Sequence, residues 1–278
     1  MKTIFTFTFV IAALSVGAQD TLDCKKDLSY DKKQQVFYKK GDDSKTPVTG
    51  AAVCYPKKGQ VNKGKLVQGK WDGTVKGYDL ETGRLVGKAN YRNGVLNGAK
   101  TCYTDQGRSK DSLVYDEGDL VYSRYTTFDK AGNRTQLTES DQKKKTSTCY
   151  HYGTFEKREY LSEIHRMKGK KRDGVQEKMG YESEAGGSIF TFTEVEDLYR
   201  DGEQIKRTYY NRGVKYRIDD YSKGKPTMEN TIGTDGQVAA SYTLKGGKRH
   251  GKAIIYDGKG GSSTQEYSKG KPVNKAVK

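Results

Sequence analysis

A glycine- and tyrosine-based repeat between Gly69 and Gly107 constrains the fold of this chain more than any other feature. Tyr78, Tyr91 and Tyr103 recur at a nearly constant spacing, and a glycine follows each of them within a few residues. The step of 12 or 13 residues between the tyrosines fits one strand of five or six residues plus a turn. Glycine supplies the positive φ that tight hairpin turns require, so the pattern predicts consecutive β-hairpins.

The same spacing of aromatic residues and turn glycines continues through most of the chain. Aromatic residues at Tyr115 and Phe128 extend the first series, and a second series runs through Tyr199, Tyr210, Tyr221, Tyr242, Tyr256 and Tyr267. Two strands make a unit of about two dozen residues, which is typical of repeat arrays. We therefore predict a polar lead-in at 19–35, a first array at 36–135, an irregular lysine-rich segment at 136–162, a second array at 163–271 and a basic tail at 272–278.

Composition narrows the fold class to a thin β-sheet. The chain has 21 Tyr and 33 Gly, while Leu, Ile and Val are sparse, so it cannot fill a thick aliphatic core. It is also too aromatic for a disordered chain. Amphipathic tyrosines can cover a thin sheet while their hydroxyls stay in water. Segments with apolar residues at helical spacing and without glycine are nearly absent, so no helix is expected.

The first residues have the pattern of a signal peptide. Lys2 supplies a positive charge, the stretch from Ile4 to Val16 is apolar, and Val16-Gly17-Ala18 offers small residues at a cleavage site. We predict removal of residues 1–18 after Ala18 and a secreted or periplasmic protein. The alternatives are an uncleaved anchor or a first strand. The apolar stretch is too short to span a membrane, and we expect no transmembrane segment elsewhere.

Export permits disulfides among Cys24, Cys54, Cys102 and Cys149. Cys54 and Cys102 occupy the same position in different units, about four strands or roughly 19 Å apart in a regular sheet. A disulfide requires Cα atoms within about 7 Å, so this pair is disfavoured. Cys24 with Cys54 is the more feasible pair.

Two stretches, Gly94 to Tyr103 and Gly247 to Tyr256, resemble the MORN-repeat-variant family. That family's unit is a glycine, three residues, a second glycine and a strand whose fifth residue is aromatic. The match covers about 36–107 and 199–270. The repeat-defining residues are Gly50, Tyr55, Gly73, Tyr78, Gly94, Gly98, Tyr103, Tyr242, Gly247, Gly251, Tyr256 and Tyr267. The resemblance implies an all-β, elongated, twisted, single-layer antiparallel sheet of tandem β-hairpins without catalytic residues. Some bacterial members are described as antitoxin components, a role that conflicts with an export signal.

No catalytic, metal or cofactor site is predicted from the sequence. His151 lies two residues from Cys149, but this spacing does not match a zinc site. Cys149 also occupies an ordinary repeat position before Tyr150, and His250 lies in a turn, while His165 stands alone. A thin sheet offers no deep pocket, which most active sites need.

The net charge of +16 is the remaining functional signal. Lysine at edges and turns blocks sheet-to-sheet aggregation, and this solubility role explains part of the excess. The alternative is a surface for polyanions such as acidic glycans, lipopolysaccharide or anionic lipid, while nucleic acid is a poorer candidate outside the cell. Candidate contact residues are Lys168, Lys170, Lys171, Arg172, Lys245, Lys248 and Arg249.

Three functions are consistent with these patterns. The first is a non-enzymatic scaffold whose sheet binds a protein partner, and the second is a polyanion- or membrane-surface-binding module. The third, an enzyme of unknown class, requires a cleft near 140–195. Trp71, the sole tryptophan, has two interpretations, a packing residue at a unit junction or a contact on an exposed face.

Overall fold

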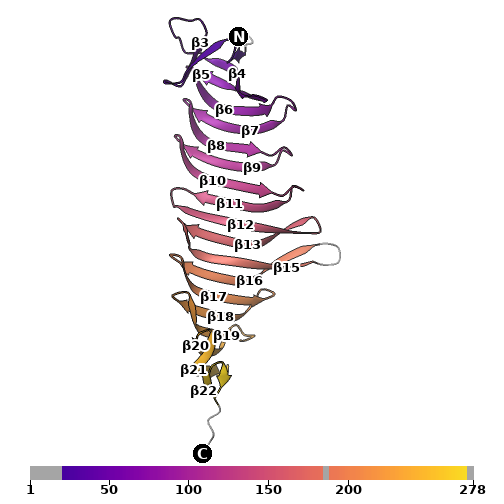
Figure 1. The fold of residues 1–278 in the computed structure, drawn as a ribbon, viewed down its shortest axis with the longest axis vertical. Helices are drawn as coiled ribbons and strands as arrows, with labels where there is room; N and C mark the ends of the chain where they lie inside the picture. The colour runs from indigo at the N-terminus through magenta and orange to yellow at the C-terminus, as the bar shows by residue number, and fades with distance from the viewer. Residues whose placement is uncertain (1–20, 184–187, 274–278) are drawn as a thin grey trace, which may run out of the picture. The chain divides into compact units, whose positions relative to one another are not determined.

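The computed structural model describes residues 21–183 and 188–273, and these residues form strands and turns without a helix. The chain divides into two compact units, of which the first ends at Gly107 and the second begins at Arg108. In each unit, antiparallel strands follow one another along the chain (Figure 1). The predicted all-β fold of tandem hairpins is therefore confirmed. The predicted signal peptide lies outside the described residues, and the boundary between the units falls inside the predicted first array.

The first unit contains eight strands, five of which form a continuous antiparallel sheet from β4 to β8. β1 pairs with β4 in parallel, and β2 and β3 form a separate hairpin. The strands are β1 (Leu22–Asp23), β2 (Leu28–Asp31), β3 (Val36–Lys39), β4 (Gly50–Lys57), β5 (Gln60–Val67), β6 (Lys70–Asp79), β7 (Leu85–Arg92) and β8 (Val95–Tyr103).

The β2–β3 hairpin adds a small packed element to the predicted single-layer sheet. Leu28 of this hairpin is buried in one cluster with Ala52 and Leu66 of the sheet, and Phe37 and Trp71 pack against that cluster. The apolar residues of the predicted polar lead-in thus form part of a small core. The sequence pattern missed this core because the hairpin's apolar side chains do not follow the repeat.

Gly69 shows how closely the hairpin approaches the sheet. Its N–H donates to the carbonyl of Val48 at 2.6 Å, and its own carbonyl accepts from the N–H of Phe37 at 2.7 Å. A Cβ atom at Gly69 would lie 2.4 Å from the Phe37 carbonyl oxygen, so only glycine permits this contact. Trp71 contacts the Phe37 ring edge-on, with centroids 6.2 Å apart, which favours its interpretation as a packing residue.

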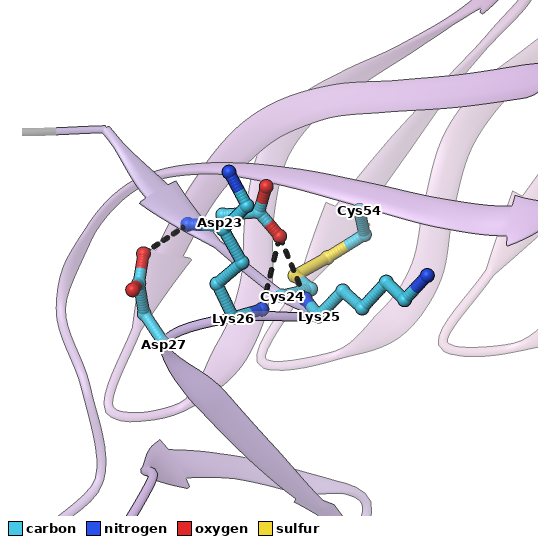
Figure 2. Close-up of a disulfide and its surroundings, with 6 residues drawn as sticks. All are labelled: Asp23, Cys24, Lys25, Lys26, Asp27 and Cys54. Carbon is cyan, nitrogen blue, oxygen red and sulfur yellow. Dashed lines mark hydrogen bonds between the residues drawn. A yellow bond between two sulfur atoms is a disulfide. The ribbon is translucent and has the colours of Figure 1, made fainter.

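A disulfide joins the start of the chain to β4, as predicted (Figure 2). Cys24 and Cys54 have their Cα atoms 4.8 Å apart. The turn that carries Cys24 is held by side chains, because Asp23 accepts from the N–H groups of Lys25 and Lys26 at 2.8 and 3.1 Å. Asp27 in turn accepts from the Asp23 N–H at 2.8 Å. Cys102 and Cys149 are free thiols.

The second unit is a sheet of consecutive antiparallel strands from β9 to β23, and Figure 1 shows its ribbon rotating from face-on at β12–β16 to edge-on at β20–β22. β14 and β15 both pair with β13 and continue one another across a short break at Asp173. The strands are β9 (Ser109–Asp116), β10 (Asp119–Phe128), β11 (Arg134–Asp141), β12 (Thr146–Phe155), β13 (Arg158–Lys168), β14 (Lys171–Arg172), β15 (Gly174–Ser183), β16 (Ile189–Arg200), β17 (Glu203–Asn211), β18 (Val214–Ser222), β19 (Lys225–Ile232), β20 (Val238–Lys245), β21 (Lys248–Tyr256), β22 (Ser262–Ser268) and β23 (Lys271–Pro272).

Residues 136–162, predicted to be irregular, form most of β11, all of β12 and the start of β13. Their turns lack the glycines on which the sequence argument relied. In the β11–β12 turn, the Asp141 side chain accepts from the Lys144 N–H at 2.9 Å and Lys145 adopts φ 55°. In the β12–β13 turn, Glu156 and Lys157 both have positive φ. Non-glycine residues therefore take the left-handed positions here.

The repeat glycines have two distinct structural roles. The first glycine of each glycine-three-residues-glycine unit lies in a two-residue turn with positive φ at both positions, as at Asn93-Gly94 (51° and 83°). The second glycine lies in a β-bulge: Gly98 has φ 90°, between the Ala89–Lys100 and Tyr91–Leu96 pairs. Gly73 and Gly251 occupy equivalent bulges in β6 and β21. The spacing of the two glycines thus fixes the distance from turn to bulge.

Replacing Leu66 by alanine should destabilise the first unit by about 2–5 kcal/mol, because the side chain is fully buried and a cavity would remain. Trp71 packs against the same core, so its fluorescence during urea unfolding of the full chain reports this loss. Val95→Ala is the control, since Val95 is 43% exposed, and it should change the stability by less than about 0.5 kcal/mol. Equal effects of the two substitutions would contradict the assigned core.

Candidate functional site

The basic residues of the second unit gather along one edge of its sheet. Successive turns of an antiparallel meander alternate between two edges. The turns β11–β12, β13–β14, β16–β17, β18–β19, β20–β21 and β22–β23 therefore share an edge with the acidic β9–β10 turn, and Figure 1 shows those from β11–β12 to β18–β19 on the left of this unit. We call this row of turns the lysine edge, which is distinct from an edge strand of the sheet. Its basic residues are Lys143, Lys144, Lys145, Lys168, Lys170, Lys171, Arg172, Arg200, Lys223, Lys225, Lys245, Lys248, Lys269 and Lys271.

Most of this charge is not neutralised within the described residues. Lys143 contacts Asp116 at 3.6 Å and Lys144 contacts Asp141 at 3.4 Å, but the described part of the chain supplies no ion pair to the other basic residues of the lysine edge. All of them except Arg172 also lack a described aromatic partner; Arg172 donates to the Tyr199 hydroxyl at 3.2 Å. The lysine edge therefore presents free ammonium groups to solvent.

Main-chain hydrogen bonds fix the spacing of these turns. The turn glycines Gly169, Gly202 and Gly270 donate their N–H groups to carbonyls next to the preceding turn on the same edge, at 2.7–2.9 Å. Gly202 lies over the aliphatic stem of Lys171, since a Cβ atom there would meet that stem at 3.4 Å. Lys171 therefore combines a packing role with an exposed charge.

Arg249 must be removed from the predicted polyanion-binding residues. Its guanidinium pairs with the buried Glu229 and stacks over the Tyr242 ring, with 3.5 Å from its central carbon to the ring centroid. These contacts hold the guanidinium against the face of the sheet, so it does not point into solvent at the turn. The other six predicted residues, Lys168, Lys170, Lys171, Arg172, Lys245 and Lys248, are exposed and lie on the lysine edge.

Arg249 belongs to a row of acids, arginines and tyrosines that replaces an apolar core on this face. The cross-strand register places Asp197, Arg207, Asp219, Glu229 and Tyr242 directly beside one another on β16 to β20. Asp219 is only 2% exposed and Glu229 7% exposed. Buried carboxylates require charged or hydrogen-bonding partners, and the arginines provide them.

The pairing in this row is bidentate. Arg207 donates from Nε and Nη2 to the two Asp197 oxygens at 2.6 and 2.8 Å. Arg217 donates to both oxygens of Asp219 at 2.7 Å and lies 3.3 Å from Glu229. The Tyr209 ring lies under both guanidiniums, with centroid distances of 6.0 and 5.0 Å. Hydrogen bonding to Asp219 raises the pKa of Arg217, which keeps it charged.

The sequence suggested that the tyrosine hydroxyls face water. Several of them are instead bonded to carboxylates. The Tyr210 hydroxyl donates to Glu196 at 2.6 Å. Burial, together with that hydrogen bond, raises the pKa of Tyr210 well above its ordinary value of about 10. These tyrosines link neighbouring strands and serve the sheet's stability.

In the first unit, three exposed lysines form a direct cross-strand row. Lys63 of β5 is opposite Lys76 of β6, which is opposite Lys88 of β7. Like charges directly opposite one another on neighbouring strands destabilise a sheet, so a favourable interaction must offset this repulsion. Lys63 lies 5.5 Å from the Tyr78 ring centroid, but no ion pair neutralises the three lysines among residues 21–107. From Gly50 to Tyr103 the sequence has ten Lys and Arg against three Asp and Glu.

The structure also assembles a cluster that the sequence argument dismissed. Cys149 and His151 on β12 face Thr138 and Gln136 on β11 and His165 and Glu163 on β13. Cys149 Sγ lies 3.3 Å from His151 Nε2, and His165 Nε2 lies 2.9 Å from Glu163. The two histidine rings meet edge-on with centroids 5.1 Å apart. The sequence showed only the Cys149–His151 pair, and the strand register adds the residues of β11 and β13 to it.

Residues 21–183 and 188–273 contain neither a metal-binding cluster nor a membrane-spanning helix. No group of three or more His, Cys, Asp and Glu side chains is arranged to hold a metal ion there. These residues also contain no helix with the length and apolar character needed to cross a membrane.

Comparisons with known proteins add little. No protein-family profile matches the chain, and no curated protein matches it. Among solved structures, the crystal structure of accessory secretory protein 1, 2 and 3 in Streptococcus pneumoniae is similar with 14% identity and a TM-score of 0.26. The match covers 40% of this chain and 19% of that chain, so the chain spans about a fifth of its length. A likeness this slight carries no argument about function.

Replacing Arg217 by methionine should destabilise the second unit by about 3 kcal/mol, because Asp219 would stay buried without its partner. Arg212→Met is the matched control, since Arg212 and Glu182 form an exposed pair with 76% and 49% side-chain exposure. The control should cost less than about 1 kcal/mol. Urea unfolding followed by far-UV circular dichroism measures both values. A loss from Arg217→Met no larger than that of the control would show that the buried row does not stabilise the sheet.

Proposed function

We propose that this chain is an exported, MORN-like scaffold that binds an extended polyanion, such as an acidic glycan, along the lysine edge of its second unit. The observation that carries the proposal is the one-sided placement of unneutralised lysines at successive turns. Twelve of the fourteen basic residues on this edge have no ion pair among the described residues. A surface with this charge attracts polyanions and loses them as salt screens the attraction.

The spacing of the turns suits a linear ligand. Turns on one edge are two strands apart, about 9.5 Å at an interstrand distance of 4.7–4.9 Å. Six such turns span roughly 50 Å within the second unit. A linear polymer with a negative charge on each sugar or phosphate could contact several turns at once, and each weak contact would add to the affinity. The lysine row of β5–β7 offers a second basic surface on the first unit.

Export and the family resemblance support the choice of ligand. The apolar N-terminal sequence predicts secretion, and the Cys24–Cys54 disulfide is compatible with an oxidising compartment. Outside the cytoplasm, acidic glycans, lipopolysaccharide and anionic lipid headgroups are the abundant polyanions. The resemblance to MORN-repeat variants implies a binding surface without catalytic residues.

Heparin chromatography and sedimentation with anionic vesicles test this proposal on the mature full-length chain. We expect retention on heparin that disappears by about 0.5 M salt, where the Debye length falls to a few ångströms. Retention that does not change with salt would contradict an electrostatic site. Binding to vesicles or lipopolysaccharide but not to heparin would identify a membrane surface as the ligand.

A matched pair of quadruple variants tests the lysine edge itself. The edge variant carries Lys→Gln at Lys170, Lys223, Lys225 and Lys245. The control removes four exposed charges at the other edge through glutamine substitutions at Lys130, Lys157, Arg158 and Lys259. Both variants lose the same net charge, and each includes one lysine with positive φ. We expect heparin elution to shift to lower salt mainly in the edge variant. Equal shifts would mean that net charge, and not the lysine edge, determines binding.

A protein partner is the second candidate function, and an aromatic cluster on the second unit favours it. Tyr160 lies 4.3 Å from Tyr181 between ring centroids, and Phe155 lies 5.5 Å from Tyr181. Tyr181 is 39% exposed. Exposed aromatic side chains are enriched in protein interfaces.

Replacing Tyr181 by serine should strongly reduce capture of such a partner from an envelope fraction. Polyanion binding should remain, because the lysine edge is unchanged. Tyr256→Ser is the control, since it removes an exposed tyrosine of 42% exposure elsewhere on the sheet. Quantitative mass spectrometry of the captured proteins provides the measurement. Recovery of no protein that depends on the aromatic cluster would remove this candidate.

A further inference from the structure

The cluster around Cys149 is separate from the lysine edge and has its own chemistry. Two adjacent cross-strand rows build it: Gln136, His151 and Glu163 form one row, and Thr138, Cys149 and His165 form the other. All six side chains project from the same face of β11, β12 and β13, because directly paired residues share a face. All six are half-buried, so solutes can reach them.

The sulfur of Cys149 is surrounded by hydrogen-bonding groups. Gln136 Nε2 donates to Sγ at 3.0 Å, and Thr138 Oγ1 donates at 3.5 Å. His151 Nε2 lies 3.3 Å from Sγ and is placed to accept the thiol proton. An imidazole adjacent to a thiol can act as the base that takes its proton.

The second histidine positions the first. His165 Nε2 is bonded to Glu163 at 2.9 Å, and the His165 ring packs edge-on against the His151 ring. This contact restricts rotation of His151 about its side-chain bonds. A thiol beside an imidazole base is the pairing that activates cysteine nucleophiles, and here a ring contact with His165 supports the base.

We propose that Cys149 is a reactive nucleophilic thiol that forms a mixed disulfide with small-molecule disulfides. Cys149 attacks one sulfur of the disulfide R–S–S–R, its proton passes to His151 Nε2, and the S–S bond of the disulfide breaks. The leaving thiolate takes that proton and departs as R–SH. Cys149 then carries the group R through a new S–S bond, so atoms and electrons balance.

Cys102 is the internal control for this reaction. It is also a free, half-buried cysteine in a strand, but its cross-strand neighbour is Gly87, and no described histidine lies beside it. The two thiols thus share compartment, exposure class and repeat position, and differ in their neighbours. Any difference in reactivity reports on the cluster around Cys149.

The test treats the full-length protein with glutathione disulfide at pH 7 and follows both cysteines by peptide-resolved mass spectrometry. We expect Cys149 to react at least about tenfold faster than Cys102, a threshold set below the roughly 100-fold or more that a positioned base typically contributes. In 6 M urea the two rates should become similar, because unfolding separates the cluster. Equal rates in the folded protein would overturn the proposal without the need for any variant.

Substitution of His151 by glutamine tests whether the imidazole, and not solvent exposure alone, makes Cys149 reactive. We expect the Cys149 rate to fall at least about fivefold while the Cys102 rate stays unchanged. His250→Gln, at an exposed position on β21, should change neither rate. An unchanged Cys149 rate in His151→Gln would overturn the assigned role of the imidazole. Far-UV circular dichroism of each variant confirms that the sheet is retained.

Discussion

Main-chain hydrogen bonding between consecutive antiparallel strands is the interaction on which this structure depends. A thin sheet has little interior, so apolar burial cannot supply most of the stability, as it does in a compact domain. The two-residue turns make the pairing local, because each strand meets the next within a few residues. Turn glycines add a further bond by donating to the preceding turn on the same edge, as Gly202 does to Arg172 at 2.9 Å. The regular spacing of the turns, and with it the spacing of the lysines, follows from these bonds.

Side chains on the two units compensate for the thin interior in different ways. The first unit folds its β2–β3 hairpin over the sheet and closes a small apolar core around Leu66, held by the Cys24–Cys54 disulfide. The second unit uses carboxylates, arginines and tyrosines in register across β16 to β20. Such a row is costly to desolvate and depends on complete pairing. It also fixes the strand register, because a slip by one residue would leave Asp219 and Glu229 on the wrong face.

Glycine and tyrosine spacing was sufficient to predict the hairpins, most of their turns and the Cys24–Cys54 pair. It was less informative where the chain makes turns without glycine, as at Asp141 to Lys145, so the region of β11 and β12 was predicted only as an irregular segment. It also could not place Cys149 beside His165, because their contact arises from pairing between strands 16 residues apart in sequence. Local patterns report turns and faces, whereas the register decides which side chains meet. Reactive clusters in a repeat sheet are for this reason hidden from the sequence.

The lysine edge poses a choice between solubility and binding, and its asymmetry favours binding. Charges that only prevent aggregation are needed at the exposed edge strands and work with either sign. Here most of the lysines lie at turns between paired strands, away from the last strand β23. Fourteen basic residues on the lysine edge outnumber seven acidic ones two to one, whereas the opposite turns mix Lys130, Lys157 and Lys259 with Asp129, Glu156 and Asp257. The seven acidic residues are Asp116, Glu117, Asp119, Asp141, Asp173, Asp201 and Glu203. Concentrating one sign at one side raises the repulsion that folding must overcome. A ligand with closely spaced negative charges would remove that repulsion, and it would do so most effectively if it ran across successive turns.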